Sequence, residues 1–181
     1  MKPLTLPAFV WRVLASHMLT YFLAGLAAFT VFDYASLYST TELKLLMRST
    51  DSPWVAAGPG LQVIRGTLFG LVLWPLAPRI AAGWRGALEL FAIVAGLAVL
   101  GAAGPAPGSL EGFFFTTLPG KVQLLGLPEV VVQTFAFSFL VSWWCQRPAR
   151  WLNVVAAVGV AAVLLLSTLG VLAATGVLKP A

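Results

Sequence analysis

The sequence predicts an all-α membrane protein: a polytopic bundle of five transmembrane helices, with the N-terminus in the cytoplasm and the C-terminus outside. The first observation is composition, since 60% of the residues are hydrophobic and only 9% are charged, whereas soluble domains usually carry about 25% charged residues. The second is a mean hydropathy of +0.93, concentrated in long apolar runs. No intervening segment is long enough to fold by itself, so residues 1–181 form a single integral membrane domain.

The five apolar runs cover residues 9–32, 59–78, 86–104, 128–146 and 151–175. The first run follows a basic start, and it is longer than the 7–15-residue core of a signal peptide, so we interpret it as an uncleaved span. The second is expected to begin just after Pro59, because proline suits the first turn of a helix. Two longer segments, 33–57 and 105–127, are the predicted outer loops. The second of these is rich in apolar residues and is expected to fold back on the bundle.

Charge distribution gives the predicted orientation. A cytoplasmic N-terminus places six basic residues inside and five of the six carboxylates outside, which is the positive-inside pattern. The inner basic residues are Lys2, Arg12, Arg79, Arg85, Arg147 and Arg150, and the outer acids are Asp33, Glu42, Asp51, Glu111 and Glu129. Six of the seven tryptophans lie near the same inner interface. We therefore predict a multi-pass protein of a bacterial-type inner membrane.

The predicted partner is the lipid bilayer. The net charge of +5 comes from basic residues scattered at span ends, which is typical of topology signals and not of a nucleic-acid surface. Gly66 and Gly70 form a GxxxG motif on which another helix can pack. The sequence leaves the oligomeric state open. With one cysteine and one histidine, no zinc or haem site can be built from those residue types alone, and we expect no cofactor or metal.

Arg65 is the first candidate functional residue, because it interrupts the apolar run GLQVIRGTLFGLVLWPLAP. An ionisable residue inside a span is a functional hypothesis by default. It lies about five residues from the outer end of the span, roughly 7–8 Å along the helix axis. Two interpretations stay open: the side chain reaches the outer headgroups, or it faces the bundle and holds a carboxylate or an anionic ligand. Gln62, three residues earlier, lies on the same helical face.

Glu129 and Gln133 are expected at a similar depth, one turn apart at the start of the fourth span. If the second and fourth spans are neighbours, Glu129 would meet Arg65 in a partly buried ion pair. The competing interpretation is that Glu129 complements the dipole of its helix N-terminus.

Glu111, Arg48 and Asp51 complete the candidate ligand-binding set on the outer side. Each is individually typical of a solvated loop. Because independent topology signals place all of them with Arg65 and Glu129 at one leaflet, together they predict an outward-facing polar pocket.

Three functions are compatible with this pattern. The first is binding or translocation of a small anionic solute or a lipid headgroup, with Arg65 and Arg48 as the anion contacts. The second is a non-catalytic accessory subunit of a larger membrane complex. The third is an enzyme that acts on an outer-leaflet lipid through Glu111 or Glu129. The chain contains no GxxxxGK[ST], HExxH, GxSxG or CxxC motif, so no catalytic residue is assigned and the sequence favours a non-enzyme.

Overall fold

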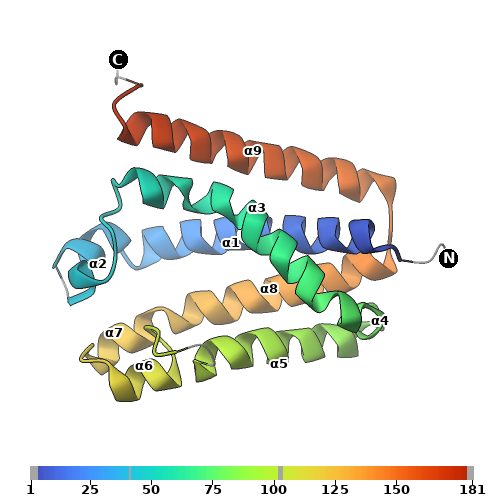
Figure 1. The fold of residues 1–181 in the computed structure, drawn as a ribbon, viewed down its shortest axis with the longest axis horizontal. Helices are drawn as coiled ribbons and strands as arrows, with labels where there is room; N and C mark the ends of the chain where they lie inside the picture. The colour runs from blue at the N-terminus through green and yellow to red at the C-terminus, as the bar shows by residue number, and fades with distance from the viewer. Residues whose placement is uncertain (1–3, 41, 102–103, 179–181) are drawn as a thin grey trace.

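The computed structural model describes residues 4–40, 42–101 and 104–178, and within them it contains helices and no strand (Figure 1). The long helices are α1 (Leu6–Val31), α3 (Pro53–Leu73), α5 (Trp84–Leu100), α8 (Leu127–Gln146) and α9 (Arg150–Ala174). The short helices are α2 (Tyr34–Thr40), η1 (Glu42–Leu45), η2 (Trp74–Leu76), α4 (Ala77–Ile80), α6 (Leu110–Phe115) and α7 (Gly120–Leu125). The long helices run side by side in alternating directions (Figure 1).

The bundle has two ends of different character (Figure 1). The α2 end carries α2, η1, α6, α7 and the last turn of α9. The α4 end carries the start of α1, the η2–α4 turn and the short connection from α8 to α9. The two ends carry opposite charges. The α4 end has the arginines Arg79, Arg85, Arg147 and Arg150, and the α2 end has the carboxylates Asp33, Glu42, Asp51, Glu111 and Glu129. Lys2 and Lys179 lie outside the described residues.

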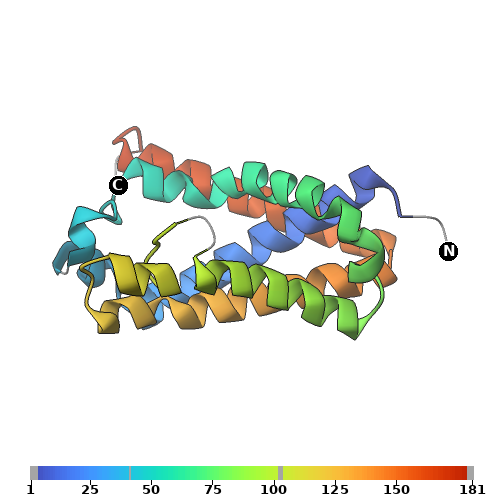
Figure 2. The ribbon, with the colours of Figure 1, turned by 60° about the horizontal axis from the view of Figure 1, so that its bottom comes forward.

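Four helical segments are long and apolar enough to cross a membrane: Leu6–Val31, Pro53–Ile80, Gly120–Gln146 and Arg150–Ala174. The predicted span at 86–104 is shorter in the structure. There α5 contains 17 residues, about 25 Å of helix against a hydrocarbon core of about 30 Å. It ends where Gly101 turns into the left-handed region at φ +74°. Figure 2 shows α5 alongside α8 over most of its length.

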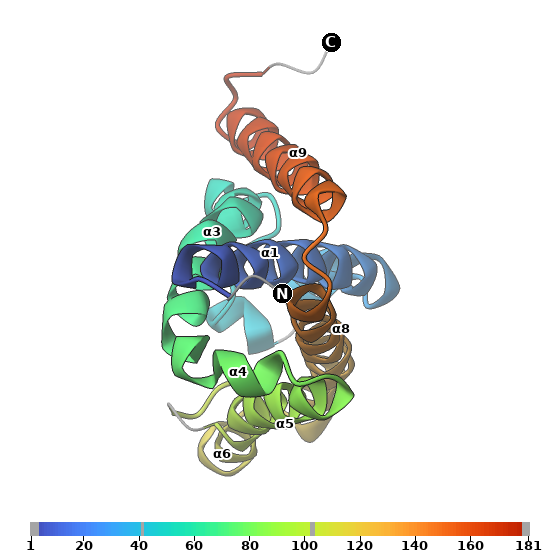
Figure 3. The same ribbon diagram turned by 90° about the vertical axis from the view of Figure 1, so that its right-hand side faces the viewer.

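The central helix is α1, which contacts α3, α8 and α9 (Figure 3). Its approach to α3 is close because the facing residues are glycines. A Cβ atom on Gly66 would lie 2.9 Å from the Cα of Leu14, and one on Gly70 would lie 2.8 Å from the Cα of Val10. The GxxxG face is therefore occupied by a helix of the same chain, and backbone contact of this kind is how membrane helices gain packing energy.

The second crossing segment begins at Pro53, six residues before the predicted start, and Pro59 lies inside the helix. A proline within a membrane helix leaves backbone groups that need other partners. Ser167 of α9 supplies one: its hydroxyl donates to the Ala56 carbonyl at 2.7 Å and accepts from the Gly60 amide at 3.2 Å. The α3–α9 contact thus stabilises the turn around Pro59.

Candidate functional site

A cleft of about 290 Å³ opens at the α2 end, between α1, α2 and the first turns of α3 and α8. It has one acidic side chain, that of Glu129, and five aromatic rings. The lining residues are Tyr21, Phe22, Gly25, Leu26, Phe29, Tyr34, Tyr38, Thr50, Val55, Pro59 and Glu129. We call it the tyrosine–glutamate pocket, because every tyrosine of the chain lines it.

Glu129 is held in the pocket by a hydrogen bond from α2. It lies in the first turn of α8, after a proline that begins the helix, and that position suits a carboxylate because of the helix dipole. The Tyr34 hydroxyl donates to Glu129 Oε2. On the other side, Gly25 leaves room: a Cβ atom there would lie 3.6 Å from Glu129 Oε1.

Tyr34 and Tyr38 are stacked on successive turns of α2, with ring centroids 5.1 Å apart and ring planes inclined by 17°. Burial and then the hydrogen bond to the Glu129 carboxylate raise the pKa of the Tyr34 phenol. Burial, followed by the charge of Glu129, also raises the pKa of Tyr38. Both phenols therefore stay protonated at physiological pH, and Tyr34 remains a hydrogen-bond donor to Glu129.

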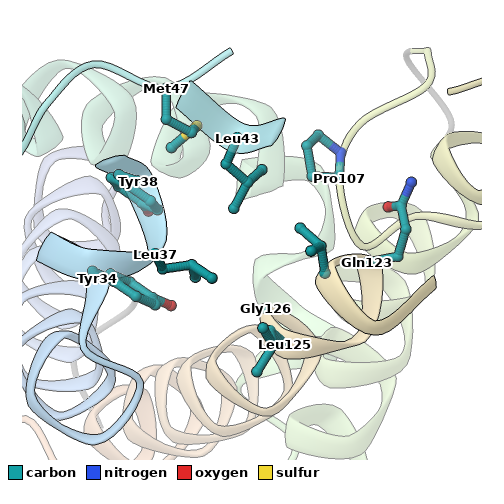
Figure 4. Close-up of a pocket in the computed structure, with 10 residues that line it drawn as sticks. Tyr34, Leu37, Tyr38, Leu43, Met47, Pro107, Gln123, Leu125 and Gly126 are labelled. Atoms are coloured by element: carbon teal, nitrogen blue, oxygen red, sulfur yellow. The ribbon is translucent and has the colours of Figure 1, made fainter. Parts of the chain in front are cut away.

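A smaller cavity of about 100 Å³ lies on the other side of the same two tyrosines (Figure 4). There Tyr34, Leu37 and Tyr38 face Pro107 and Gln123 across a gap between α2 and the α6–α7 segment. Gln123 is buried and holds that segment together, since its amide accepts from the Gly108 amide and donates to Gly112 and Thr116. Tyr34 and Tyr38 therefore line both cavities.

Arg65 does not line the tyrosine–glutamate pocket, and no ion pair joins it to Glu129 in the described part of the chain. The helices that carry them do meet, since the rings of Phe69 and Phe137 lie 6.3 Å apart, but Arg65 lies deeper than Glu129, because Gly66 packs against Leu14 whereas Glu129 lies beside Gly25. The Arg65 side chain is exposed and lies over the Phe69 ring, 5.4 Å from its centroid. The predicted similar depth of the two residues is therefore wrong.

Gln62 joins α3 to α1 in the bundle interior. Its Nε2 donates to the Gly58 carbonyl, which leaves Oε1 facing His17 Nε2 at 3.0 Å. Because an amide oxygen only accepts, His17 carries its proton on Nε2 and its Nδ1 is an acceptor. The imidazole lies edge-on to Phe69 and Phe137. The residues predicted at one depth in α3 thus have different roles, Gln62 buried and Arg65 exposed.

The remaining predicted residues lie outside the pocket. Gln133 is half-buried one turn after Glu129. Glu111 begins α6, which packs near the end of α5. Arg48 is exposed with its guanidinium 5.8 Å from the centre of the Trp54 ring, and Asp51 is exposed beside it. Of the seven predicted ligand-binding residues, Glu129 alone lines the cleft.

The interface between α1 and α8 combines apolar packing with several buried polar side chains. Gly25 faces Glu129, and the rings of His17 and Phe137 lie 5.7 Å apart. This antiparallel register places Ser16 at the depth of Ser138. Buried atoms without a hydrogen-bond partner in the described residues all lie on these two helices: Arg12 Nε, Ser16 Oγ, His17 Nδ1, Ser138 Oγ and Trp144 Nε1.

Sequence reasoning did not single out the tyrosines as site residues, although a signal was present. All three fall between positions 21 and 38, around the end of the first span. The sequence likewise does not distinguish Gly25 from the other glycines, because the group that it faces, the Glu129 carboxylate, is more than a hundred positions away. No group of three or more His, Cys, Asp and Glu side chains that could hold a metal ion occurs among the described residues.

Comparison of the chain with protein-family models, with curated proteins and with solved structures gives no match. Function is therefore argued from the site alone.

Proposed function

We propose that this protein binds, or carries across the bilayer, a small solute or a lipid headgroup in a pocket at the outer face of a bacterial-type inner membrane. In this proposal all five long helices cross the bilayer, with α5 in a locally thinner region. The N-terminus is cytoplasmic, the C-terminus is outside, and the α2 end faces outward. The protein is not an enzyme in this proposal.

The charges of the two ends support this orientation. Arginines collect at the α4 end and carboxylates at the α2 end, which is the distribution that the positive-inside rule predicts. Cys145 is buried, so a Cys145→Ala background allows single cysteines to be placed at Ser39 and Arg150, both exposed. We expect a membrane-impermeant maleimide added to spheroplasts to label Ser39→Cys and not Arg150→Cys. The reverse pattern would contradict the orientation.

The tyrosine–glutamate pocket is the observation that carries the binding proposal. A cleft with convergent polar groups and a half-buried charge is the usual form of a small-ligand site. Its position at a bundle end, with an apolar wall of Phe22, Leu26 and Val55, suits a molecule that has a polar head and an apolar remainder.

Arg65 is the proposed anion contact. Its guanidinium is exposed, lies near the middle of the bundle and makes no ion pair with a described carboxylate, so it is free to bind a phosphate or carboxylate oxygen. Gln62 fixes the helix turn from which Arg65 projects. The other predicted residues are proposed only to contact the ligand on its way to the pocket: Arg48, Gln133, Asp51 and Glu111.

Retention of lipid by the purified full chain tests this proposal. We expect native mass spectrometry from dodecyl maltoside, after addition of a phosphatidylglycerol, phosphatidylethanolamine and phosphatidylcholine mixture, to show bound phospholipid. Arg65→Ala should reduce the retained fraction several-fold. Arg147→Ala is the matched control, because Arg147 also lies over an aromatic ring but at the α4 end. Equal retention by the three proteins, or none by any, would contradict the proposal.

An accessory subunit is the second candidate, and one observation favours it. A groove of about 190 Å³ runs between the outer halves of α1 and α8, lined by Ala24, Ala27, Ala28, Val31, Phe32, Pro128, Glu129 and Val132. Small residues of this kind admit another helix. If a larger complex uses the groove, Ala27→Leu should release the partner in mild detergent, while Ala157→Leu on the exposed face of α9 should not. A monomer that is unchanged by either substitution would argue against this candidate.

A further inference from the structure

The tyrosine–glutamate pocket has a charge and ring content that selects one class of ligand. Among the described residues, Glu129 is the only charged one that lines it, and neither lysine nor arginine does. In the described residues Glu129 has no ion-pair partner. It accepts a hydrogen bond from the neutral Tyr34 hydroxyl. A half-buried carboxylate at a membrane boundary is unfavourable without a compensating positive charge.

Five of the described residues that line the pocket are aromatic. Tyr21, Phe22 and Phe29 come from α1, and the stacked pair Tyr34 and Tyr38 comes from α2. The face of an aromatic ring attracts a cation, and cages of such rings are the usual recognition sites for ammonium groups. A bare metal cation instead requires several oxygen ligands, and this pocket has few. The ring content therefore favours an organic cation.

We propose that the tyrosine–glutamate pocket binds an ammonium group, that of an amine-bearing or choline-bearing phospholipid headgroup, with Glu129 as its counter-ion. The proposal rests on the proposed function and specifies its ligand. The apolar wall formed by Phe22, Leu26 and Val55 accommodates the start of an acyl chain. A volume of about 290 Å³ holds a headgroup and not a whole phospholipid.

The test compares headgroups that differ in the ammonium group. The full chain in dodecyl maltoside is offered equal amounts of phosphatidylcholine, phosphatidylethanolamine and phosphatidylglycerol with identical acyl chains, and retained lipid is measured by native mass spectrometry. We expect both ammonium lipids to be retained about tenfold more than phosphatidylglycerol, the ratio that an ion pair and a cation–π contact together give. Free choline at millimolar concentration should compete with both ammonium lipids, because it carries the same ammonium group. Retention of choline together with no retention of either ammonium lipid would assign the site to a free cation and overturn the lipid assignment.

Two variants connect the preference to this pocket. Glu129→Gln keeps an acceptor for Tyr34 but removes the charge, and it should abolish the headgroup preference. Gly25→Leu fills the space beside the carboxylate and should reduce retention of the ammonium lipids. Glu42→Gln is the matched control, because it removes an exposed acid from the same end but outside the pocket. Circular dichroism and gel filtration check that each variant is folded.

The outcomes separate the two levels of the proposal. Equal retention of all three lipids, or a preference for phosphatidylglycerol, would overturn the ammonium assignment and leave lipid binding standing. A tenfold preference that survives both Glu129→Gln and Gly25→Leu would place the ammonium site elsewhere and overturn the assignment to this pocket. Failure to retain any of the three lipids or choline would overturn the proposed function as well.

Discussion

Helix α1 packs against α3 through backbone contact at two glycines and a buried side-chain hydrogen bond, whereas its interface with α8 combines apolar packing with buried polar groups that lack partners in the described residues. On the α3 side, Gly66 and Gly70 meet the backbone of α1, and Gln62 bonds His17. On the α8 side, Ser16 and Ser138 are fully buried and their hydroxyls are unpaired in the described residues. The first interface is built for stability. The second carries polar groups through the bundle at a cost in stability.

The largest expected effect is on the glycine side. Gly66→Ala or Gly70→Ala would place a methyl group within 3 Å of α1 backbone atoms, so the helices must separate. We expect each to lower the free energy of unfolding by about 2–3 kcal/mol, the usual cost of overpacking. Denaturation in mixed dodecyl sulfate and maltoside micelles measures it. Gly96→Ala is the control, since a Cβ atom there meets nothing within 4 Å. An equal loss from all three would show that the contact is not the cause.

The hydrogen bond between His17 and Gln62 gives the next effect. Gln62→Leu leaves the buried His17 Nε2 without its acceptor, and we expect a loss of about 1–3 kcal/mol. Replacing both partners, as in His17→Phe with Gln62→Leu, removes the unpaired group and should recover most of that loss. Gln133→Leu serves as the control in α8, because the Gln133 side chain makes no hydrogen bond with the described residues. Failure of the double substitution to recover stability would mean that His17 has a further role.

Two buried serines sharpen the comparison, because the same substitution is expected to act in opposite directions. Ser167→Ala removes the hydroxyl that bonds Ala56 and Gly60 of α3, and should cost about 1–2 kcal/mol. Ser138→Ala removes a hydroxyl that has no partner, and should leave stability unchanged or raise it by up to about 1 kcal/mol. The same denaturation assay applies. A loss at Ser138 equal to that at Ser167 would show that bound water completes the α1–α8 interface.

Much of the helix arrangement follows from hydropathy. The last run was predicted at 151–175 and is found at Arg150–Ala174, and the fourth was predicted at 128–146 and is found at Leu127–Gln146. The prediction for the second helix is wrong at its start, because it takes Pro59 as the first-turn proline. Pro53 carries the same signal, and what allows a helix to continue through Pro59 includes a hydroxyl from Ser167, which is remote in sequence.

The site was less predictable than the helices, because depth depends on where each helix begins and lateral contacts depend on how the bundle closes. The sequence predicts Arg65 and Glu129 at a similar depth, but Gly66 packs against Leu14 whereas Glu129 lies beside Gly25, so Arg65 lies about 16 Å deeper along α1. The predicted depth was wrong because α3 begins at Pro53, six residues before the predicted start. The partner that Glu129 does have, Tyr34, comes from a short helix 95 positions away, for which no periodic pattern provides a signal.

The smallest expected effect concerns the attachment of α2 to this polar side of the bundle. Tyr34→Phe removes the hydrogen bond to Glu129 and should loosen α2 by about 0.5–1 kcal/mol, measured as faster amide exchange in residues 34–40. Because the pKa of Tyr34 is raised above its ordinary value of 10.0 in the folded protein, its contribution is complete below that value and is lost as pH rises through the folded pKa. Alkaline pH should therefore speed exchange in α2 of the wild type more than in Tyr34→Phe. Equal acceleration in both proteins would show that the Tyr34–Glu129 bond does not hold α2 in place.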